Sequence, residues 1–522
     1  MPLLRREASE PTGPSCEAFA FFAGVLALCA ALGQKVFYKV DGPDLVYLLH
    51  QHVAHGQPLH HPWHVGYLPA LDLFRRFLAL FGAGGDLLRV GELFSAAGVA
   101  AGVAFFRAGL RRLGIEGGEA RAAALLLALN PGVLFFGSVV EMHGPALGAV
   151  GVAFWWMCRS AAAPRAWRMA LLGLLTHGAF LMHATNLFLP LLLLPWFVVL
   201  RRGTGSARKD LALALLAVAV HAALFVAMPR VFPSFYGDYA DLSAAFARES
   251  SIQRPQGLEW MPAIFGQEWL LPLLPLSVLV VPAAFRSELR AESLVLALGL
   301  LPYLYLATRQ LVFEPERGAY LLPLLLPAAR ICSAFWIGKR GLSVLVVLSM
   351  LGGILQILIH ERGLAGAYRE FANGVAKAAR GASRPPFVLI GARKLPGEDG
   401  PHDELAMAFA SLDPSTFLWV RSQAQMPRER FDPAQAAATV AWLGGILDQG
   451  RPVLVTEGAM AELATPSEVL RGEKDTGQPS NDHYAGPLFL DALRKSFRFA
   501  RAAERPLAGG TRTTSVWRLE RR

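Results

Sequence analysis

The apolar block LALALLAVAVHAALFVAM, residues 211–228, decides the fold of this chain. It holds no charged side chain over its 18 residues, and a helix of that length rises about 27 Å, close to the hydrocarbon thickness of a bilayer. Arg208 and Lys209 precede the block directly. Because Lys and Arg gather at the cytoplasmic ends of membrane helices, the block is predicted to cross a membrane.

Similar apolar blocks recur along the chain and predict about eleven spanning helices. Their predicted bounds are 17–36, 88–108, 120–138, 143–160, 166–182, 184–200, 209–229, 265–285, 291–308, 318–337 and 341–360. The first block differs from a signal peptide, because no convincing small-x-small cleavage site lies before Lys35 and further blocks follow. We therefore expect it to remain as an anchor.

The composition divides the chain into two parts. Of the 522 residues, 54% are hydrophobic and 17% are charged, whereas a soluble chain carries about a quarter charged residues. The deficit falls in residues 1–360, predicted as the transmembrane domain, and residues 361–385 are interpreted as a polar linker. The predicted fold is mainly α, a polytopic transmembrane helix bundle with a small C-terminal α/β domain over 386–522.

The net charge of +10 lies largely in short loops between the apolar blocks, so it indicates orientation rather than nucleic-acid binding. The basic loops alternate correctly for eleven crossings. They contain Arg5 and Arg6; Arg107, Arg111 and Arg112; Arg159, Arg165 and Arg168; Arg201, Arg202, Arg208 and Lys209; Arg286 and Arg290; Lys339 and Arg340. These loops are predicted to be cytoplasmic, in the inner membrane of a bacterium. The remaining loops and the C-terminal domain are then periplasmic.

Strand-like and helix-like segments alternate in the C-terminal domain. Strands are predicted at 386–390, 452–456 and 515–519, with helices at 436–447 and 486–497. This alternation is typical of a small α/β domain. The segment contains no glycine-rich phosphate loop and no catalytic triad, so a structural role and an acceptor-docking role both remain open.

The first outer loop carries two acidic residues, Asp41 and Asp44, just past the first span. Pro43 suits the first position of a helix, and residues 43–55 have amphipathic spacing. A helix along the membrane surface is therefore predicted, with Asp41 at its entrance. The alternative interpretation is that Asp41 only caps this helix.

Histidines are concentrated in the same loop, where six of the thirteen fall between His50 and His64. His60 and His64 are four residues apart, which makes a zinc site conceivable. Pro62 would disrupt a helix between them, and the spacing fits no standard metal pattern. Loop packing and headgroup contacts are the preferred interpretation, and no metal ligand is assigned.

Further ionisable residues fall at outer membrane edges: Glu141 and His143, then His183, then Arg309 and Arg317. Ionisable groups at that depth are costly and usually face a cavity, although an exposed turn among headgroups is the alternative. Arg pairs well with phosphate, and a carboxylate can take a proton from an acceptor hydroxyl. The set therefore suits a lipid-phosphate substrate.

The layout resembles the GT-C glycosyltransferases, membrane enzymes that use polyprenyl-phosphate-linked sugars. It looks most similar to the protein O-mannosyltransferase-related group, whose first loop carries an Asp-x-x-acid motif and then a His-Pro-x-Gly-Tyr-Pro-like motif. Residues 41–44 (DGPD) match the first motif in register, and residues 61–69 (HPWHVGYLP) match the second loosely. Residues 89–95 also fit, and the resemblance extends over about 15–330.

The resemblance implies that Asp41 is the catalytic base, that Asp44 supports it or orients the acceptor, and that Glu141 assists at the acceptor or at a metal site. It also implies that His183 and Arg317 lie near the lipid phosphate. The candidate substrate-binding residues are His61, His64, Tyr67, His143, His183, Arg309 and Arg317. The implied partners are a polyprenyl-phosphate-sugar donor, membrane lipid and an acceptor hydroxyl on protein, lipid or glycan. No cofactor is assumed, although some members of the family use a divalent metal.

Two other functions compete with this hypothesis. A transporter or lipid flippase would carry ionisable residues near the middle of several spans, and inverted repeats. Such charges are scarce here, and no clear repeat is found. A non-catalytic scaffold that displays the C-terminal domain would tolerate replacement of the acidic residues in the first loop.

Overall fold

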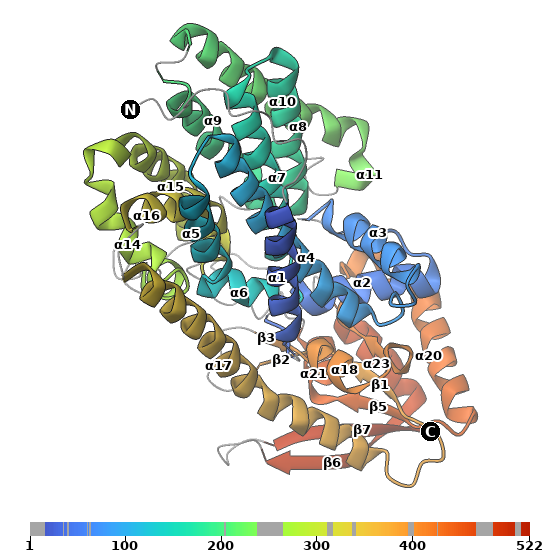
Figure 1. Ribbon diagram of the computed structural model, residues 1–522. Coiled ribbons are helices and arrows are strands. Elements are labelled where there is room, and N and C mark those ends of the chain that lie inside the picture. The colour runs from blue at the N-terminus through green and yellow to red at the C-terminus, as the bar shows by residue number, and fades with distance from the viewer. Residues whose placement is uncertain are drawn as a thin grey trace. The chain divides into compact units, whose positions relative to one another are not determined.

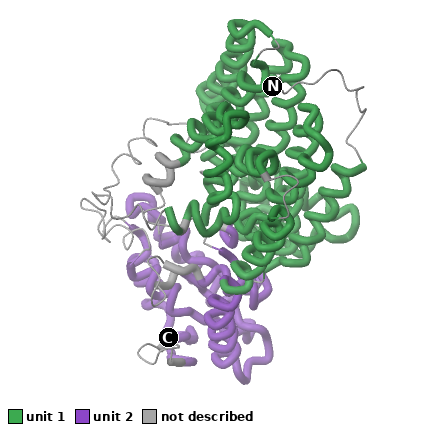
Figure 2. The backbone as a smooth tube through the Cα atoms, turned by 60° about the vertical axis from the view of Figure 1, so that its left-hand side comes forward, with its two compact units in different colours: residues 1–34, 45–359 green, residues 35–44, 360–522 purple. Residues whose placement is uncertain are grey.

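The computed structural model describes residues 16–34, 36–38, 41–59, 61, 64–202, 205–236, 265–310, 317–336, 341–394, 401–424, 426–465, 484–506 and 513–522. The chain forms two compact units, drawn in green and purple in Figure 2. Residues 1–34 and 45–359 make up the first, here called the membrane unit. Residues 35–44 and 360–522 make up the second, the C-terminal unit.

The membrane unit is built from helices, labelled in Figure 1. Helix α2 (Asp41–His55) begins in the C-terminal unit and ends in the membrane unit. Helix α17 (Gly341–Ala378) begins in the membrane unit and ends in the C-terminal unit. The remaining elements are α1 (Cys16–Ala31), α3 (Tyr67–Ala79), α4 (Leu87–Arg112), α5 (Gly117–Ala128), α6 (Pro131–Gly137), α7 (His143–Ala162), α8 (Ala166–Met182), η1 (Ala184–Phe188), α9 (Leu189–Leu200), α10 (Ala207–Val231), α11 (Pro233–Tyr236), η3 (Phe265–Leu270), α14 (Leu276–Ala284), η4 (Ser287–Leu289), α15 (Arg290–Gln310), η5 (Ala319–Leu324) and α16 (Leu325–Trp336).

Each of the eleven predicted spans coincides with one helix or with two consecutive ones. Within the described ranges, α4, α10 and α17 are individually long and apolar enough to cross a bilayer, and the bent pair α5–α6 would be a fourth such crossing. The other predicted spans are shorter or interrupted helices. The mainly helical fold is therefore confirmed, whereas the count of eleven crossings stays a prediction.

The bend between α5 and α6 has a local cause at Asn130 and Pro131. Pro131 has no N–H to continue the helix, and the Asn130 side chain instead accepts a bond of 3.1 Å from the Gly132 N–H. The amide of Asn130 also donates to the Leu273 carbonyl at 3.0 Å. The two helices meet at 63°, so the predicted span over 120–138 is broken rather than continuous.

Glycines bring α4 and α7 into backbone contact. A Cβ on Gly98 would lie 2.4 Å from the Pro145 Cα, and one on Gly144 would lie 2.6 Å from the Ser95 carbonyl oxygen. Small residues permit this approach between membrane helices. The contact places the turn before α7, which carries Glu141, directly against α4.

The C-terminal unit contains a five-stranded mixed sheet in the order β4-β1-β5-β7-β6. Its strands are β1 (Phe387–Ile390), β4 (Phe417–Trp419), β5 (Val453–Thr456), β6 (Phe497–Pro506) and β7 (Thr513–Arg521). β1 pairs in parallel with β4 and β5, whereas β7 runs antiparallel to both β5 and β6. A separate two-stranded pair joins β2 (Ala392–Lys394) and β3 (Pro401–Asp403).

Helices of the C-terminal unit pack with the sheet around one apolar core that includes Leu389, Leu443, Val455 and Leu493. They are α19 (Arg421–Ala424), α20 (Pro433–Asp448), α21 (Glu457–Ala464) and α23 (Gly486–Ser496), and the unit also contains α18 (Glu404–Ser411), η6 (Pro414–Thr416) and η7 (Arg428–Arg430). All three predicted strands and both predicted helices are present. Residues 361–378 of the predicted linker continue α17 as helix.

Candidate functional site

Four histidine rings form a continuous series of ring contacts in the membrane unit. His61 and His64 lie between α2 and α3, His143 begins α7, and His183 separates α8 from η1. The ring centroids are 4.8 Å apart for His61 and His64, 4.7 Å for His64 and His183, and 4.4 Å for His183 and His143. All four residues are 5–8% exposed. The structure thus gathers four candidate substrate-binding residues that are as many as 122 positions apart.

Backbone donors fix the protonation of two of these rings. The His64 N–H donates to His61 Nδ1 at 3.2 Å, and the Thr185 N–H donates to His183 Nδ1 at 3.3 Å. A ring nitrogen accepts such a bond only when it carries no proton, so both contacts favour the tautomer with its proton on Nε2.

The surroundings of the cluster also favour neutral imidazoles. Burial, followed by the neighbouring His61, lowers the pKa of His183 to about 3. Burial, reinforced by His183, His61 and His143, lowers the pKa of His64 well below its ordinary range. Desolvation disfavours the charged form of a histidine. At neutral pH both side chains are therefore hydrogen-bonding groups without charge.

Aromatic contacts connect the cluster to Arg317. Tyr320 lies 5.6 Å from His183 between ring centroids, and Phe136 lies 4.9 Å from His143. Phe136 contacts Phe135 at 5.2 Å, and the Arg317 guanidinium stands 5.0 Å from the Phe135 centroid. The predicted cation is thus separated from the histidines by two phenylalanine rings.

The backbone of Arg317 is held in an uncommon conformation. Its φ is 48°, in the left-handed region, and Gly318 follows with a φ of 75°. The buried Glu268 accepts both of their N–H groups, at 3.1 Å from Arg317 and 2.7 Å from Gly318. For a residue other than glycine this conformation costs about 1–2 kcal/mol, which the two bonds to the carboxylate offset. The sequence analysis did not identify Glu268.

Glu141 is only 2% exposed, so the alternative of an exposed turn is wrong for this residue. Ser95 donates its hydroxyl proton to the Glu141 carbonyl at 2.9 Å and accepts the Glu141 N–H at 3.2 Å. The Glu141 carboxylate accepts the Met142 N–H at 3.0 Å. Burial and then the charge of Glu141 raise the pKa of Tyr67. The acid is therefore fixed beside a phenol that keeps its proton.

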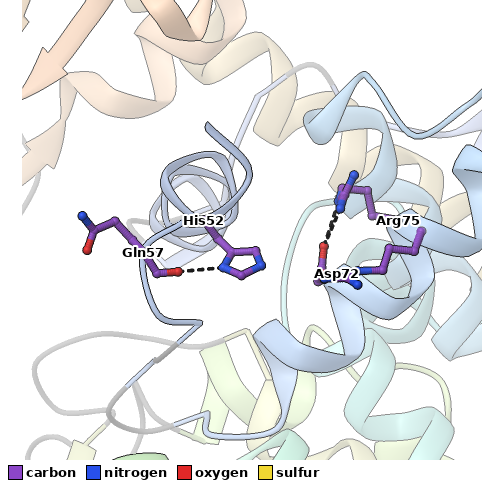
Figure 3. Close-up of polar contacts among 5 residues, drawn as sticks. His52, Gln57, Asp72 and Arg75 are labelled. Atoms are coloured by element: carbon purple, nitrogen blue, oxygen red, sulfur yellow. Dashed lines mark hydrogen bonds and ion pairs between the residues drawn. The ribbon is translucent and has the colours of Figure 1, made fainter. Parts of the chain in front are cut away.

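The start of α3 fixes the loop that carries His61 and His64. The Gly66 N–H donates to the Leu181 carbonyl at 2.8 Å, and a Cβ on Gly66 would lie 2.9 Å from the Leu181 Cβ. Further along α3, Asp72 pairs with Arg75 at 2.8 Å (Figure 3) and also with Arg76 at 2.7 Å. Burial would raise the pKa of Asp72, but the bonds from the two arginines outweigh it and lower the pKa.

The end of α2 is fixed as well, because His52 Nδ1 lies 2.7 Å from the Gln57 carbonyl oxygen (Figure 3). Helix α2 confirms the predicted helix over 43–55 and begins two residues earlier, at Asp41.

Three predicted residues belong to the other unit or have side chains outside the described part of the chain. Asp41 and Asp44 belong to the C-terminal unit, and the side chains of Asp41 and Arg309 lie outside the described part of the chain. The members brought together in the membrane unit are His61, His64, Tyr67, Glu141, His143, His183 and Arg317. His60 also lies outside the described residues. Those that are described include no group of three or more His, Cys, Asp or Glu side chains arranged to hold a metal ion.

No protein-family model matches the chain, and no curated protein matches it significantly. Two solved structures of ArnT from Cupriavidus metallidurans are similar to it, one bound to undecaprenyl phosphate and one in the apo state. Each has a TM-score of 0.55 and 14% identity, and the match covers 97% of this chain and 98% of ArnT. The chain has an ArnT-like fold.

The ArnT-like fold extends over the helical bundle and the C-terminal unit alike, and it confirms the predicted fold class, mainly helical with a small C-terminal mixed α/β part. Arabinofuranosyltransferase AftD from mycobacteria also matches, with a TM-score of 0.45 and 13% identity over 96% of this chain and 41% of AftD. That score is too low to support an argument. Neither protein is described as a mannosyltransferase, so the finer resemblance stays a prediction.

Proposed function

We propose that the chain is an integral membrane glycosyltransferase that moves a sugar from a polyprenyl-phosphate donor to an acceptor hydroxyl. The observation that carries the proposal is the buried cluster of His61, His64, His143 and His183. It occurs in a fold similar to that of ArnT, a protein solved with undecaprenyl phosphate bound. A membrane protein with buried hydrogen-bonding groups of this kind suits a substrate with a polar head and a long apolar tail.

In the proposed reaction the acceptor oxygen attacks the anomeric carbon of the donor sugar. The bond from that carbon to the phosphate oxygen breaks, and polyprenyl phosphate leaves with the electron pair. Asp41 takes the proton of the acceptor hydroxyl, and Asp44 supports Asp41. General-base catalysis of this type contributes roughly 10²–10⁴-fold to a rate.

The histidine cluster and Arg317 would receive the phosphate of the donor. His183 accepts the Thr185 N–H at Nδ1, which favours a proton on Nε2 that can be donated to the phosphate. Neutral donors bind a phosphate without the cost of burying additional charges, and a guanidinium adds a charge-assisted bond. Glu141, held by Ser95 and Met142, would assist at the acceptor.

The alternation of basic loops supports a reaction on the periplasmic face of a bacterial inner membrane, with the C-terminal unit on the same side. Labelling single cysteines introduced at Arg202 and at Arg451 in intact cells would test this orientation. The proposal expects labelling from outside only at Arg451.

The test of activity uses the purified chain, a labelled polyprenyl-phosphate sugar and a panel of acceptors. We expect wild type to form product and Asp41→Asn to lower kcat by about 100-fold or more. Asp86→Asn is the matched control, because Asp86 caps α4 through the Arg89 N–H at 3.0 Å and asparagine caps equally well. Full activity of Asp41→Asn would refute its role as base. Donor binding and transport without any product would favour the transporter or flippase instead.

A further inference from the structure

We propose that the C-terminal unit positions the acidic motif of the first outer loop. The motif is Asp41-Gly42-Pro43-Asp44, and residues 35–44 group with residues 360–522 rather than with the helices that precede and follow them. The proposal rests on the proposed function, in which Asp41 is the base. It assigns a role to residues 386–522, whose sequence contains no glycine-rich phosphate loop and no catalytic triad.

A hydrogen bond joins the two parts of this unit across 331 residues. The Phe37 N–H donates to the Tyr368 hydroxyl oxygen, which lies 3.1 Å away in α17. Phe37 is 2% exposed and Tyr368 is 6% exposed. A buried backbone donor needs a partner, and here the phenol of a distant helix provides it. Phe37 is therefore fixed in position only four residues before Asp41.

Aromatic rings hold the same segment. The ring centroids of Phe37 and Phe409 of α18 are 6.4 Å apart. The Phe409 ring is perpendicular to the ring of Phe417 in β4, with a centroid distance of 5.2 Å. Tyr38 meets His360 edge-on at 5.8 Å. The side chains that contact residues 36–38 are buried, so these contacts belong to a packed core and not to the protein surface. The sheet and α17 thus support the residues that lead into the motif.

The motif itself continues this packing. Gly42 and Pro43 are buried, and α2 begins at Asp41. A catalytic group must be held within about 0.5 Å of its productive position, and groups on loops need support to reach that precision. The packing of residues 36–38 provides such support for Asp41. Tyr368 and Phe409 are accordingly positioning residues, which act on the reaction through the loop.

The experiment compares two hydroxyl deletions in the full-length protein, Tyr368→Phe and Tyr303→Phe. Tyr303 is the matched control because it is fully buried in α15 and its hydroxyl has no hydrogen-bond partner among the described residues. The measurements are kcat, the donor KM, undecaprenyl-phosphate binding and hydrogen exchange of the peptide that contains Phe37.

We expect Tyr368→Phe to lower kcat at least fivefold, while the donor KM and undecaprenyl-phosphate binding stay within twofold of wild type. Exchange of the Phe37 amide should become faster. Tyr303→Phe should change none of these quantities. A merely structural role of Tyr368 would instead lower lipid binding together with kcat, and that result would overturn the inference.

A kcat of Tyr368→Phe within twofold of wild type would overturn it as well. If wild type transfers sugar but Tyr368→Phe is unaffected, only the positioning role fails. If wild type transfers no sugar from any donor, the proposed function fails and the inference fails with it.

Discussion

Removal of the Ser95 hydroxyl is the perturbation whose consequence the structure defines most completely. That single group donates to the Glu141 carbonyl and accepts the Glu141 N–H, and Ser95 is fully buried. Ser95→Ala leaves a buried donor and a buried acceptor without a partner. Each such group costs about 1–3 kcal/mol, so for the two groups we expect a total loss of about 2–6 kcal/mol.

Ser160→Ala provides a matched control in the same pair of helices. Ser160 is also fully buried, but its hydroxyl donates only to the Trp156 carbonyl of its own helix, at 2.8 Å. A bond of that type adds little to a carbonyl that already lies in a helix. We expect this variant to lose less than about 1 kcal/mol.

The assay is thermal unfolding of both purified variants in the same detergent, combined with kcat for sugar transfer. The midpoint of Ser95→Ala should fall clearly below that of Ser160→Ala, and only Ser95→Ala should lose activity, because only it displaces Glu141. Equal midpoints and equal activities would refute the claim that Ser95 fixes the Glu141 turn.

Two further predictions concern the histidine cluster and Arg317. In the folded chain the pKa of His183 is about 3, below its ordinary value of 6.5. At a pH between these two values, His183 is protonated in the unfolded chain but not in the folded chain. Stability should therefore fall as pH decreases from 6.5, by about 2 kcal/mol at pH 5. Unfolding midpoints at pH 5 and 7.5 should show a smaller difference in His183→Gln, and an unchanged difference would contradict the assignment. Glu268→Ala removes the acceptor of the Arg317 and Gly318 N–H groups and should raise the donor KM about tenfold. Gly318→Ala should act in the same direction, because its Cβ would lie 2.7 Å from the Glu268 carbonyl oxygen, and an unaltered KM in both variants would refute the role of this turn.

The helices of the membrane unit were predictable because the bilayer imposes a simple requirement on sequence. A run of about 20 apolar residues must satisfy its backbone internally, and a helix is the structure that does so. The block at 209–229 therefore corresponds closely to α10 (Ala207–Val231). The break between α5 and α6 was not predicted, although Asn130-Pro131 is the dipeptide that causes it.

The candidate site was predictable in its members but not in its contacts. His143 and His183 interrupt apolar sequence and His61 lies in the histidine-rich first outer loop, which identified them one at a time. No spacing along the chain shows that their rings belong to one series of contacts, since that depends on how α3, α7 and α8 pack. Ser95 and Glu268 were missed for the same reason: each acts through bonds to residues 46–50 positions away.

The role proposed for Tyr368 was hidden by a greater separation. A tyrosine in a polar segment after the last apolar block carries no signal of its own. Only the folded chain shows that the Tyr368 hydroxyl accepts a hydrogen bond from the N–H of Phe37 in the first outer loop.

The central claim is that this protein transfers a lipid-linked sugar on the side of the membrane that holds its C-terminal unit. The most direct measurement reconstitutes the chain in vesicles with a fixed orientation and supplies a labelled polyprenyl-phosphate sugar, with acceptor, to one side at a time. The account predicts that product forms only when both substrates are on the side of the C-terminal unit, and that Asp41→Asn abolishes it. Product on the opposite side, or a donor that binds without ever losing its sugar, would contradict the account.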